Sequence, residues 1–169
     1  MSAIAEAIGA ATEYLTAHPE DARSTDSAAV ARLDDGLRVT VTAPDGQQVV
    51  TDMVESVGGT NSAQSPGWLL RAAIASCTVT LTAMRAAVLG VALSDVAVTV
   101  DSESDDLGIL GIEESVPAGP LSVRLQVRVT APDADDAVVR DLVDWAVAHC
   151  PVTDAVSRAV PMVVDIEVA

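Results

Sequence analysis

Two cysteines, Cys77 and Cys150, are the residues of this sequence best suited to covalent chemistry. A thiolate is a nucleophile that peroxides oxidise to a sulfenic acid, and two thiols within reach of each other can form a disulfide. Cysteine is also a small apolar residue that is often simply buried in a core. Both interpretations, a reactive thiol pair and two packed core residues, are open on the residue types alone.

The surroundings of Cys150 favour a thiolate. Pro151 is suited to the first position of a helix, which makes Cys150 the predicted N-cap of a short helix. The unpaired N–H groups and the positive end of the helix dipole at that position lower the pKa of a thiol. His149 is the preceding residue and could support the charge when it is protonated.

A metal site is not expected, because the two cysteines lack the CxxC or HxxxH spacing that zinc sites use. His18 has no cysteine or second histidine near it in the sequence and is interpreted as a solvated residue at a helix end. The acidic stretch 103–120 lacks the EF-hand pattern and is interpreted as a loop. Gly58-Gly59 matches no phosphate-binding fingerprint, so this loop is not predicted to bind a phosphate group.

Cys77 is predicted to lie in the middle of a long helix over residues 65–90. Pro66 suits the start of this helix, and Gly90 suits its end. One helical face carries six apolar positions and is predicted to be buried: Leu70, Ile74, Cys77, Leu81, Met84 and Val88. Its uncharged part, residues 72–84, is too short to cross a bilayer.

The other predicted elements surround this helix with antiparallel strands. Asp-Gly turns within residues 28–53 predict a three-stranded meander, with Arg32 and Arg38 flanking its first turn. These two arginines are either exposed strand charges or functional cations. The remaining predictions are helices over residues 3–17, 132–150 and 151–159 and strands over residues 94–102, 121–131 and 161–169.

The composition restricts the partners of the protein. The net charge is −16 and the chain has no lysine, which disfavours binding to nucleic acids and anionic membranes. No secretory signal is recognised, so a cytoplasmic location is expected. Half of the residues are apolar, but Phe is absent, and a core that lacks large rings favours burial against a second copy. We therefore expect a homodimer.

The order of these segments resembles the OsmC/Ohr family of osmotically inducible and organic hydroperoxide resistance proteins. The resemblance rests on the meander, the loop and helix start ending in SPGWLLRAAIASC, the strand DVAVTVDS, the alternating strand that follows, and the helix ending in HCPV. It assigns residues 28–169 to one OsmC-like domain and residues 1–27 to an N-terminal helical extension with a linker.

The resemblance implies an α+β fold in which antiparallel sheets flank long central helices in an intertwined homodimer. It also implies a thiol peroxidase that reduces organic hydroperoxides and needs no cofactor. Cys77 would form the sulfenic acid, Cys150 would resolve it to a disulfide, and a dithiol or lipoyl-type reductant would restore both thiols.

The sequence departs from the family pattern in the residues that support the first thiol. The family's glutamate, ten residues before the first cysteine, is Gly67 here. Asp34 is the closest match to the family's arginine, so either Arg32 or Arg38 would be the supporting cation. Because these supporting residues differ from the family pattern, two alternatives to a peroxidase are open. One is a non-catalytic protein that binds apolar ligands, and the other is a redox sensor without turnover.

Overall fold

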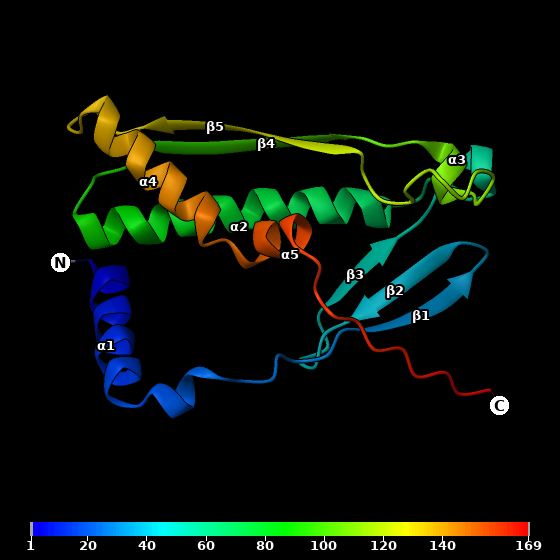
Figure 1. Ribbon diagram of the computed structural model, residues 1–169, viewed down its shortest axis with the longest axis horizontal. Coiled ribbons are helices and arrows are strands. Elements are labelled where there is room, and N and C mark those ends of the chain that lie inside the picture. The colour runs from blue at the N-terminus through cyan, green and yellow to red at the C-terminus, as the bar shows by residue number, and fades with distance from the viewer. Residues whose placement is uncertain (1, 169) are drawn as a thin grey trace. The chain divides into compact units, whose positions relative to one another are not determined.

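The computed structural model describes residues 2–168, which form two compact units. Residues 6–73 make up one unit, and residues 74–168 together with residues 2–5 make up the other. The boundary falls within the long helix α2 (Pro66–Leu89), and each unit is described below by itself. The predicted α+β class is confirmed, since the chain combines helices with purely antiparallel sheets (Figure 1).

The first unit contains the predicted meander. Its strands β1 (Val30–Asp35), β2 (Arg38–Thr42) and β3 (Gln48–Thr51) pair antiparallel in the order β1-β2-β3. Gly36 and Gly46 occupy the two turns with φ of 56° and 85°, a conformation that glycine adopts without steric cost. Ahead of the meander lie α1 (Ala3–Ala17), which has the predicted bounds, and a short 3-10 helix, η1 (Pro19–Ala22).

Helix α2 has nearly the predicted bounds, but the predicted buried face is wrong in part. Its buried residues are Ile74, Thr78, Thr82 and Ala86, spaced four apart. The threonine hydroxyls can be buried because each donates to the carbonyl one turn earlier, Thr78 to Ile74 over 2.8 Å and Thr82 to Thr78 over 2.7 Å. Of the larger predicted members, Leu70, Cys77, Leu81 and Met84 are partly exposed and Val88 is exposed.

By length and composition, α2 is the one helix within residues 2–168 that could cross a membrane. An 18-residue window has a mean hydropathy of 1.6, and 22% of that window is buried. Central helices of soluble proteins pass the same test. Arg71 and Arg85 interrupt the apolar part of α2, as noted from the sequence.

The second unit contains a two-stranded antiparallel sheet of β4 (Asp95–Glu103) and β5 (Ser122–Thr130). The strands pair without interruption from Asp95 opposite Thr130 to Glu103 opposite Ser122. A short helix, α3 (Asp106–Ile109), lies in the acidic connection, which the sequence predicted only as a loop. The predicted alternation of β5 is confirmed, because its valines and Leu125 are half-buried and its arginines are exposed.

Two helices follow the sheet, α4 (Asp136–Ala148) and α5 (Pro151–Ser157). Helix α4 begins later than predicted because residues 131–134 form a turn, closed by the Ala134 N–H and the Ala131 carbonyl at 3.2 Å, and Asp135 is the N-cap. Leu142 and Ala146 of α4 have no exposed surface and belong to the core, with Ile74 and Ala86 of α2.

The predicted final strand is absent from the described part of the chain. Residues 159–168 contain no helix or strand, since a strand needs a neighbour to hydrogen-bond with and no described strand pairs with this segment. Its apolar side chains are strongly exposed, with Met162 and Val163 at 85% and Ile166 at 84%. Residue 169, the last of the predicted strand, lies outside the described residues.

Candidate active site

The structure brings Cys77 and Cys150 together, although they are far apart in the sequence. Cys77 projects from the middle of α2, and Cys150 is the residue that caps α5, as predicted. Both thiols are free, and each lies close enough to shift the pKa of the other. Cys150 has no exposed surface, whereas Cys77 is partly exposed. The two cysteines are therefore neighbours within the second unit.

The backbone around Cys150 holds its thiol in place. Cys150 has the extended conformation of an N-cap, with φ of −76° and ψ of 115°, and Pro151 follows at the first helical position. The Thr153 N–H donates to the Cys150 sulfur over 3.4 Å. The Thr153 hydroxyl lies 2.9 Å from the carbonyl oxygens of both Cys150 and Val147, so its one hydrogen is available to either acceptor and connects the start of α5 to the end of α4.

The two thiols differ in acidity. Burial raises the pKa of Cys77, and its hydrogen bond to Cys150 and the charge of that thiol raise the pKa further against an opposing N–H from Val152. Burial also acts to raise the pKa of Cys150, but hydrogen bonds from Thr153, Cys77 and the Val152 N–H outweigh it, so the pKa of Cys150 lies below its ordinary value. The direction predicted for an N-cap cysteine is confirmed.

An apolar cavity of about 380 Å³ is lined by neighbours of both cysteines, although neither cysteine lines it itself. Thr153, whose N–H binds the Cys150 sulfur, lines this cavity, and so does Ile74, three residues before Cys77 on α2. The rest of its apolar wall comes from Val123, Leu125, Val147, Ala148 and Val156. A site of this kind fits an apolar organic molecule with one polar group.

A stack of three side chains next to Cys150 was not identified from the sequence. The Arg85 guanidinium carbon lies 4.8 Å from the centre of the Trp145 ring system. The His149 ring is stacked on Trp145 with centroids 4.1 Å apart and planes at 15°. The His149 Nδ1 lies 2.8 Å from the Trp145 carbonyl, and this nitrogen carries the hydrogen because a carbonyl only accepts. The spacing of residues 145 and 149, one helical turn, is the signal that predicts their contact.

The two candidate arginines belong to the unit of residues 6–73. On β2, Arg38 donates from Nη1 to the Ser62 hydroxyl over 3.0 Å, and its Nε lies 3.5 Å from the carboxylate of Asp34. Arg32, on β1, lines a cavity of about 420 Å³ together with residues of the same hairpin, including Val30 and Thr42. Asp34, the closest match to the family's arginine position, thus forms an ion pair with Arg38.

Asp52 is a buried carboxylate that the sequence did not single out. Its side chain accepts five hydrogen bonds: from the N–H of Met53 (2.7 Å), from the N–H and hydroxyl of Thr60 (3.1 and 2.6 Å), and from the N–H and hydroxyl of Ser62 (3.0 and 2.9 Å). These donors hold its pKa far below the usual range, the Thr60 hydroxyl contributing most. Asp52 thereby fixes the loop that leads to α2.

Gly67 lies in the first turn of α2, where a side chain would make ordinary van der Waals contacts. A Cβ atom added there would be 3.9 Å from the Ser65 hydroxyl oxygen and 4.0 Å from Nη1 of Arg71. The position therefore accommodates a side chain, and the absence of the family's glutamate is a difference of sequence rather than a steric requirement.

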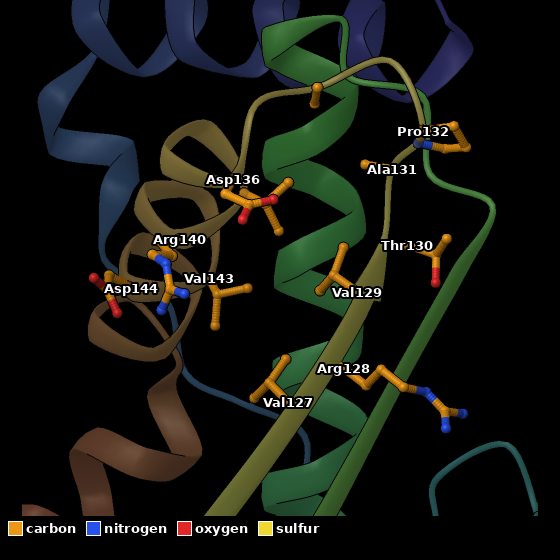
Figure 2. A pocket seen from close by; sticks show the side chains of 12 residues that line it. Val127, Arg128, Val129, Thr130, Ala131, Pro132, Asp136, Arg140, Val143 and Asp144 are labelled. Carbon is orange, nitrogen blue, oxygen red and sulfur yellow. The ribbon is translucent and has the colours of Figure 1, made fainter.

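A second, larger cavity of about 630 Å³ lies between β5 and α4 (Figure 2). Val127 and Val129 of β5 face Val143 of α4 across it, while Arg128 points to the opposite side of the sheet (Figure 2). There Arg128 lies 3.5 Å from the carboxylate of Asp95. Within residues 2–168, no group of three or more His, Cys, Asp and Glu side chains could hold a metal ion.

Solved structures with the same fold are numerous. An OsmC-like protein from Mycoplasma pneumoniae has a TM-score of 0.68 at 12% identity, covering 80% of this chain and 89% of its own. A putative osmotic stress induced and detoxification response protein from Psychrobacter arcticus has a TM-score of 0.63 at 17% identity, covering 79% and 90%. An organic hydroperoxide resistance protein OsmC from Legionella pneumophila has a TM-score of 0.57 at 20% identity, covering 79% and 91%.

A comparison with the curated proteins finds no match. At these identities the solved structures establish the fold alone. The family model for OsmC-like protein matches residues 59–165, which include both cysteines and most of the chain. The chain therefore belongs to the OsmC-like protein family.

Proposed function

We propose that this protein is a thiol peroxidase that reduces organic hydroperoxides in defence against oxidative stress. The observation that carries the proposal is the pairing of a partly exposed thiol, Cys77, with a buried thiol, Cys150, close to residues that line an apolar cavity. Several solved structures of this fold are named organic hydroperoxide resistance proteins, including one from Legionella pneumophila and one from Bacillus subtilis.

The proposed cycle uses both cysteines. The sulfur of Cys77 attacks the terminal oxygen of the hydroperoxide, the O–O bond breaks, and an alcohol leaves while Cys77 becomes a sulfenic acid. Cys150 then attacks the oxidised sulfur and releases water, which leaves a disulfide. An external dithiol, of the lipoyl type or another, reduces this disulfide, so the chain needs no bound cofactor.

The cavity next to the thiols supports an apolar substrate. Its walls are mainly Ile, Leu, Val and Ala side chains, and its polar members are Thr153, Asp154 and Ser157. An aryl or fatty-acyl hydroperoxide would exchange water for these side chains, whereas hydrogen peroxide has no apolar part to bury. We accordingly propose selection of organic peroxides over hydrogen peroxide.

A cytoplasmic homodimer is part of the proposal. Of the 24 residues of α2, four are buried, and β1 is exposed along its whole length. Residues 162–168 expose five further apolar side chains, each at 70% or more. Surfaces of this kind are typical of an interface with a second copy.

For the supporting cation we propose Arg38 rather than Arg32. The guanidinium of Arg38 has a defined orientation, because it donates to the Ser62 hydroxyl over 3.0 Å and lies 3.5 Å from the carboxylate of Asp34. A cation near a thiol favours its thiolate form.

The proposal is tested by adding one equivalent of cumene hydroperoxide to the reduced protein without oxygen, followed by thiol counting and intact mass. We expect both thiols to disappear rapidly and the mass to fall by the two hydrogens of one disulfide. Cys77→Ser should consume no peroxide, and Cys150→Ser should stop at a sulfenic acid. Two thiols that persist in the wild-type protein would rule the peroxidase out.

The same cavity supports a second candidate, a protein that binds an apolar ligand without turnover. The absence of the family's glutamate at Gly67 favours this alternative. It predicts that a variant lacking both cysteines still retains the ligand. Loss of binding in that variant would count against it, as would rapid turnover in the wild-type protein.

A further inference from the structure

The polar side chains that line the cavity of about 380 Å³ all come from α5. They are Thr153, Asp154 and Ser157, and together they are called the acceptor cluster below. We infer that this cavity selects apolar molecules whose polar end donates a hydrogen bond and carries no negative charge, such as neutral hydroperoxides and alcohols, over free carboxylates. The inference rests on the proposed function, since it names the class of hydroperoxide that the site would take.

The two hydroxyls of the acceptor cluster have lone pairs to offer but no free hydrogen. The Thr153 hydroxyl lies 2.9 Å from the carbonyl oxygens of Val147 and Cys150, and one of these takes its hydrogen. The Ser157 hydroxyl donates to the Thr153 carbonyl over 2.7 Å, with the Asp154 carbonyl at 3.3 Å. Each hydroxyl oxygen can therefore accept a hydrogen bond from a ligand, but its own hydrogen is already engaged.

Asp154 makes the acceptor cluster negative. Arg158 donates from Nε to Oδ2 of Asp154 over 2.6 Å, and the pair is partly exposed, with 49% of the Asp154 side chain and 59% of the Arg158 side chain accessible. A carboxylate has lone pairs for several donors, so Asp154 remains able to accept from a ligand. Arg158 does not line the cavity, so a ligand there meets the carboxylate rather than the guanidinium.

The backbone around the cavity also disfavours an anion. The first N–H groups of α5 could have bound one, but two of them are engaged by Cys150. The Thr153 N–H donates to its sulfur over 3.4 Å, and the Asp154 N–H donates to its carbonyl over 2.9 Å. Two further lining residues, Val147 and Ala148, are the last residues of α4, where a helix dipole is negative.

The rest of the lining fits the hydrocarbon part of such a molecule. Val123 and Leu125 lie on the half-buried face of β5, and the exposed Arg124 between them is paired with Asp101 at 2.7 Å. Among the described residues, those that line the cavity include no arginine or histidine. A neutral hydroperoxide has an apolar part for these walls and an O–H for the acceptor cluster. A free carboxylate has no hydrogen to donate, and Asp154 repels it.

The test compares two peroxides that differ in the charge of one end, the hydroperoxide of linoleic acid and that of methyl linoleate. With a dithiol present, the wild-type protein should consume the ester with a higher kcat/KM than the acid. Asp154→Asn removes the charge and adds an N–H donor, so the ester-to-acid ratio should fall about three- to five-fold, as expected for a half-exposed carboxylate. Arg158→Met leaves the charge of Asp154 without its partner and should raise the ratio.

Asp144→Asn is the matched control, because it also removes one negative charge but lies on α4 at the cavity of about 630 Å³. Its ratio should equal that of the wild-type protein. An equal fall in Asp144→Asn and Asp154→Asn would assign the discrimination to the net charge of −16 and overturn the inference. An unchanged ratio in Asp154→Asn overturns it as well. Circular dichroism of each variant establishes that it is folded.

Calorimetry with unreactive ligands separates this inference from the peroxidase activity. Cys77→Ser should bind octanol more tightly than octanoate, and adding Asp154→Asn should narrow the difference in affinity about three- to five-fold. Equal affinities, tighter binding of octanoate, or binding of neither ligand overturns the inference even if the wild-type protein consumes peroxide. A wild-type protein that leaves both peroxides intact while the preference for octanol holds overturns the peroxidase function alone.

Discussion

The hydroxyl of Ser62 donates to the buried carboxylate of Asp52 over 2.9 Å and at the same time accepts from Nη1 of Arg38 over 3.0 Å. A single side chain thus connects the loop before α2 to the second strand of the meander. Because Asp52 is held by five donors, the position of Ser62 is fixed, and the orientation of Arg38 is fixed through it.

Arg38→Ala should slow the consumption of cumene hydroperoxide about ten-fold, because the proposed supporting cation is lost. Arg32→Ala is the matched control from the same hairpin and should react at nearly the wild-type rate. Ser62→Ala should have an intermediate effect, since it leaves the guanidinium present but less restrained. Equal rates in Arg38→Ala and Arg32→Ala would remove Arg38 from the site.

Asp52→Asn should destabilise the protein at neutral pH, because an amide cannot accept from all five donors and its own N–H groups oppose them. The pKa of Asp52 is lowered in the folded state, so its contribution is complete above the unfolded value of about 4 and is lost as the pH falls toward the folded value. Urea denaturation at a series of pH values measures this. The midpoints of the two proteins should differ at pH 7 and converge in acid.

Asp45→Asn is the control variant for this urea denaturation experiment. Asp45→Asn alters an exposed carboxylate in the β2–β3 turn, so it should shift the midpoint little at any pH. A difference between Asp52→Asn and wild type that persisted unchanged into strong acid would contradict the ionised carboxylate as the origin of the stability.

Gly67→Glu should stabilise the chain by about 1 kcal/mol, because glycine is a poor helix former and a carboxylate is favourable in the first turn of a helix. The space around Gly67 accepts the side chain, and Arg71 lies one turn further along α2. If a glutamate at this position supports the first thiol, the variant should also oxidise faster. Gly67→Gln provides the same propensity without the charge, and equal oxidation rates in the two variants would show that the carboxylate is irrelevant.

Arg85 and Trp145 should show a coupling of about 0.5–2 kcal/mol in a double-mutant cycle of chemical denaturation, because the guanidinium lies 4.8 Å from the ring. Arg85→Met retains the aliphatic part of the side chain, and Trp145→Leu retains an apolar one. If the effects of the two substitutions on the free energy of unfolding are additive, the contact between Arg85 and Trp145 contributes no stabilising interaction.

Most of the fold could be predicted because its signals are local. The Asp-Gly turns determine the meander, and the alternation of valine and arginine determines β5. Proline and glycine mark the two ends of α2. The buried face of α2 was missed because hydropathy favours Leu81 and Met84 over Thr78 and Thr82, and the sequence does not show that each hydroxyl binds its own helix.

The site was only partly predictable. The cap before Pro151 predicted the acidity of Cys150, since both the cap and its donors are neighbours along the chain. The five hydrogen bonds to Asp52 come from residues up to ten positions away in the sequence. They depend on the conformation of a loop, which the hydropathy pattern does not predict. The pairing of Cys77 with Cys150 came from the family resemblance, because nothing local relates residues so distant in the sequence.

The exposed apolar side chains of residues 162–168 make the stability of the protein depend on its concentration. In the proposed dimer these side chains gain their burial from another chain, so part of the free energy of folding is supplied by association and varies with the logarithm of protein concentration. Dilution would then act as a mild denaturant. At nanomolar concentrations of this protein, a protease would cleave residues 162–168 first. At high protein concentration, where the proposed dimer forms, the same segment would be protected.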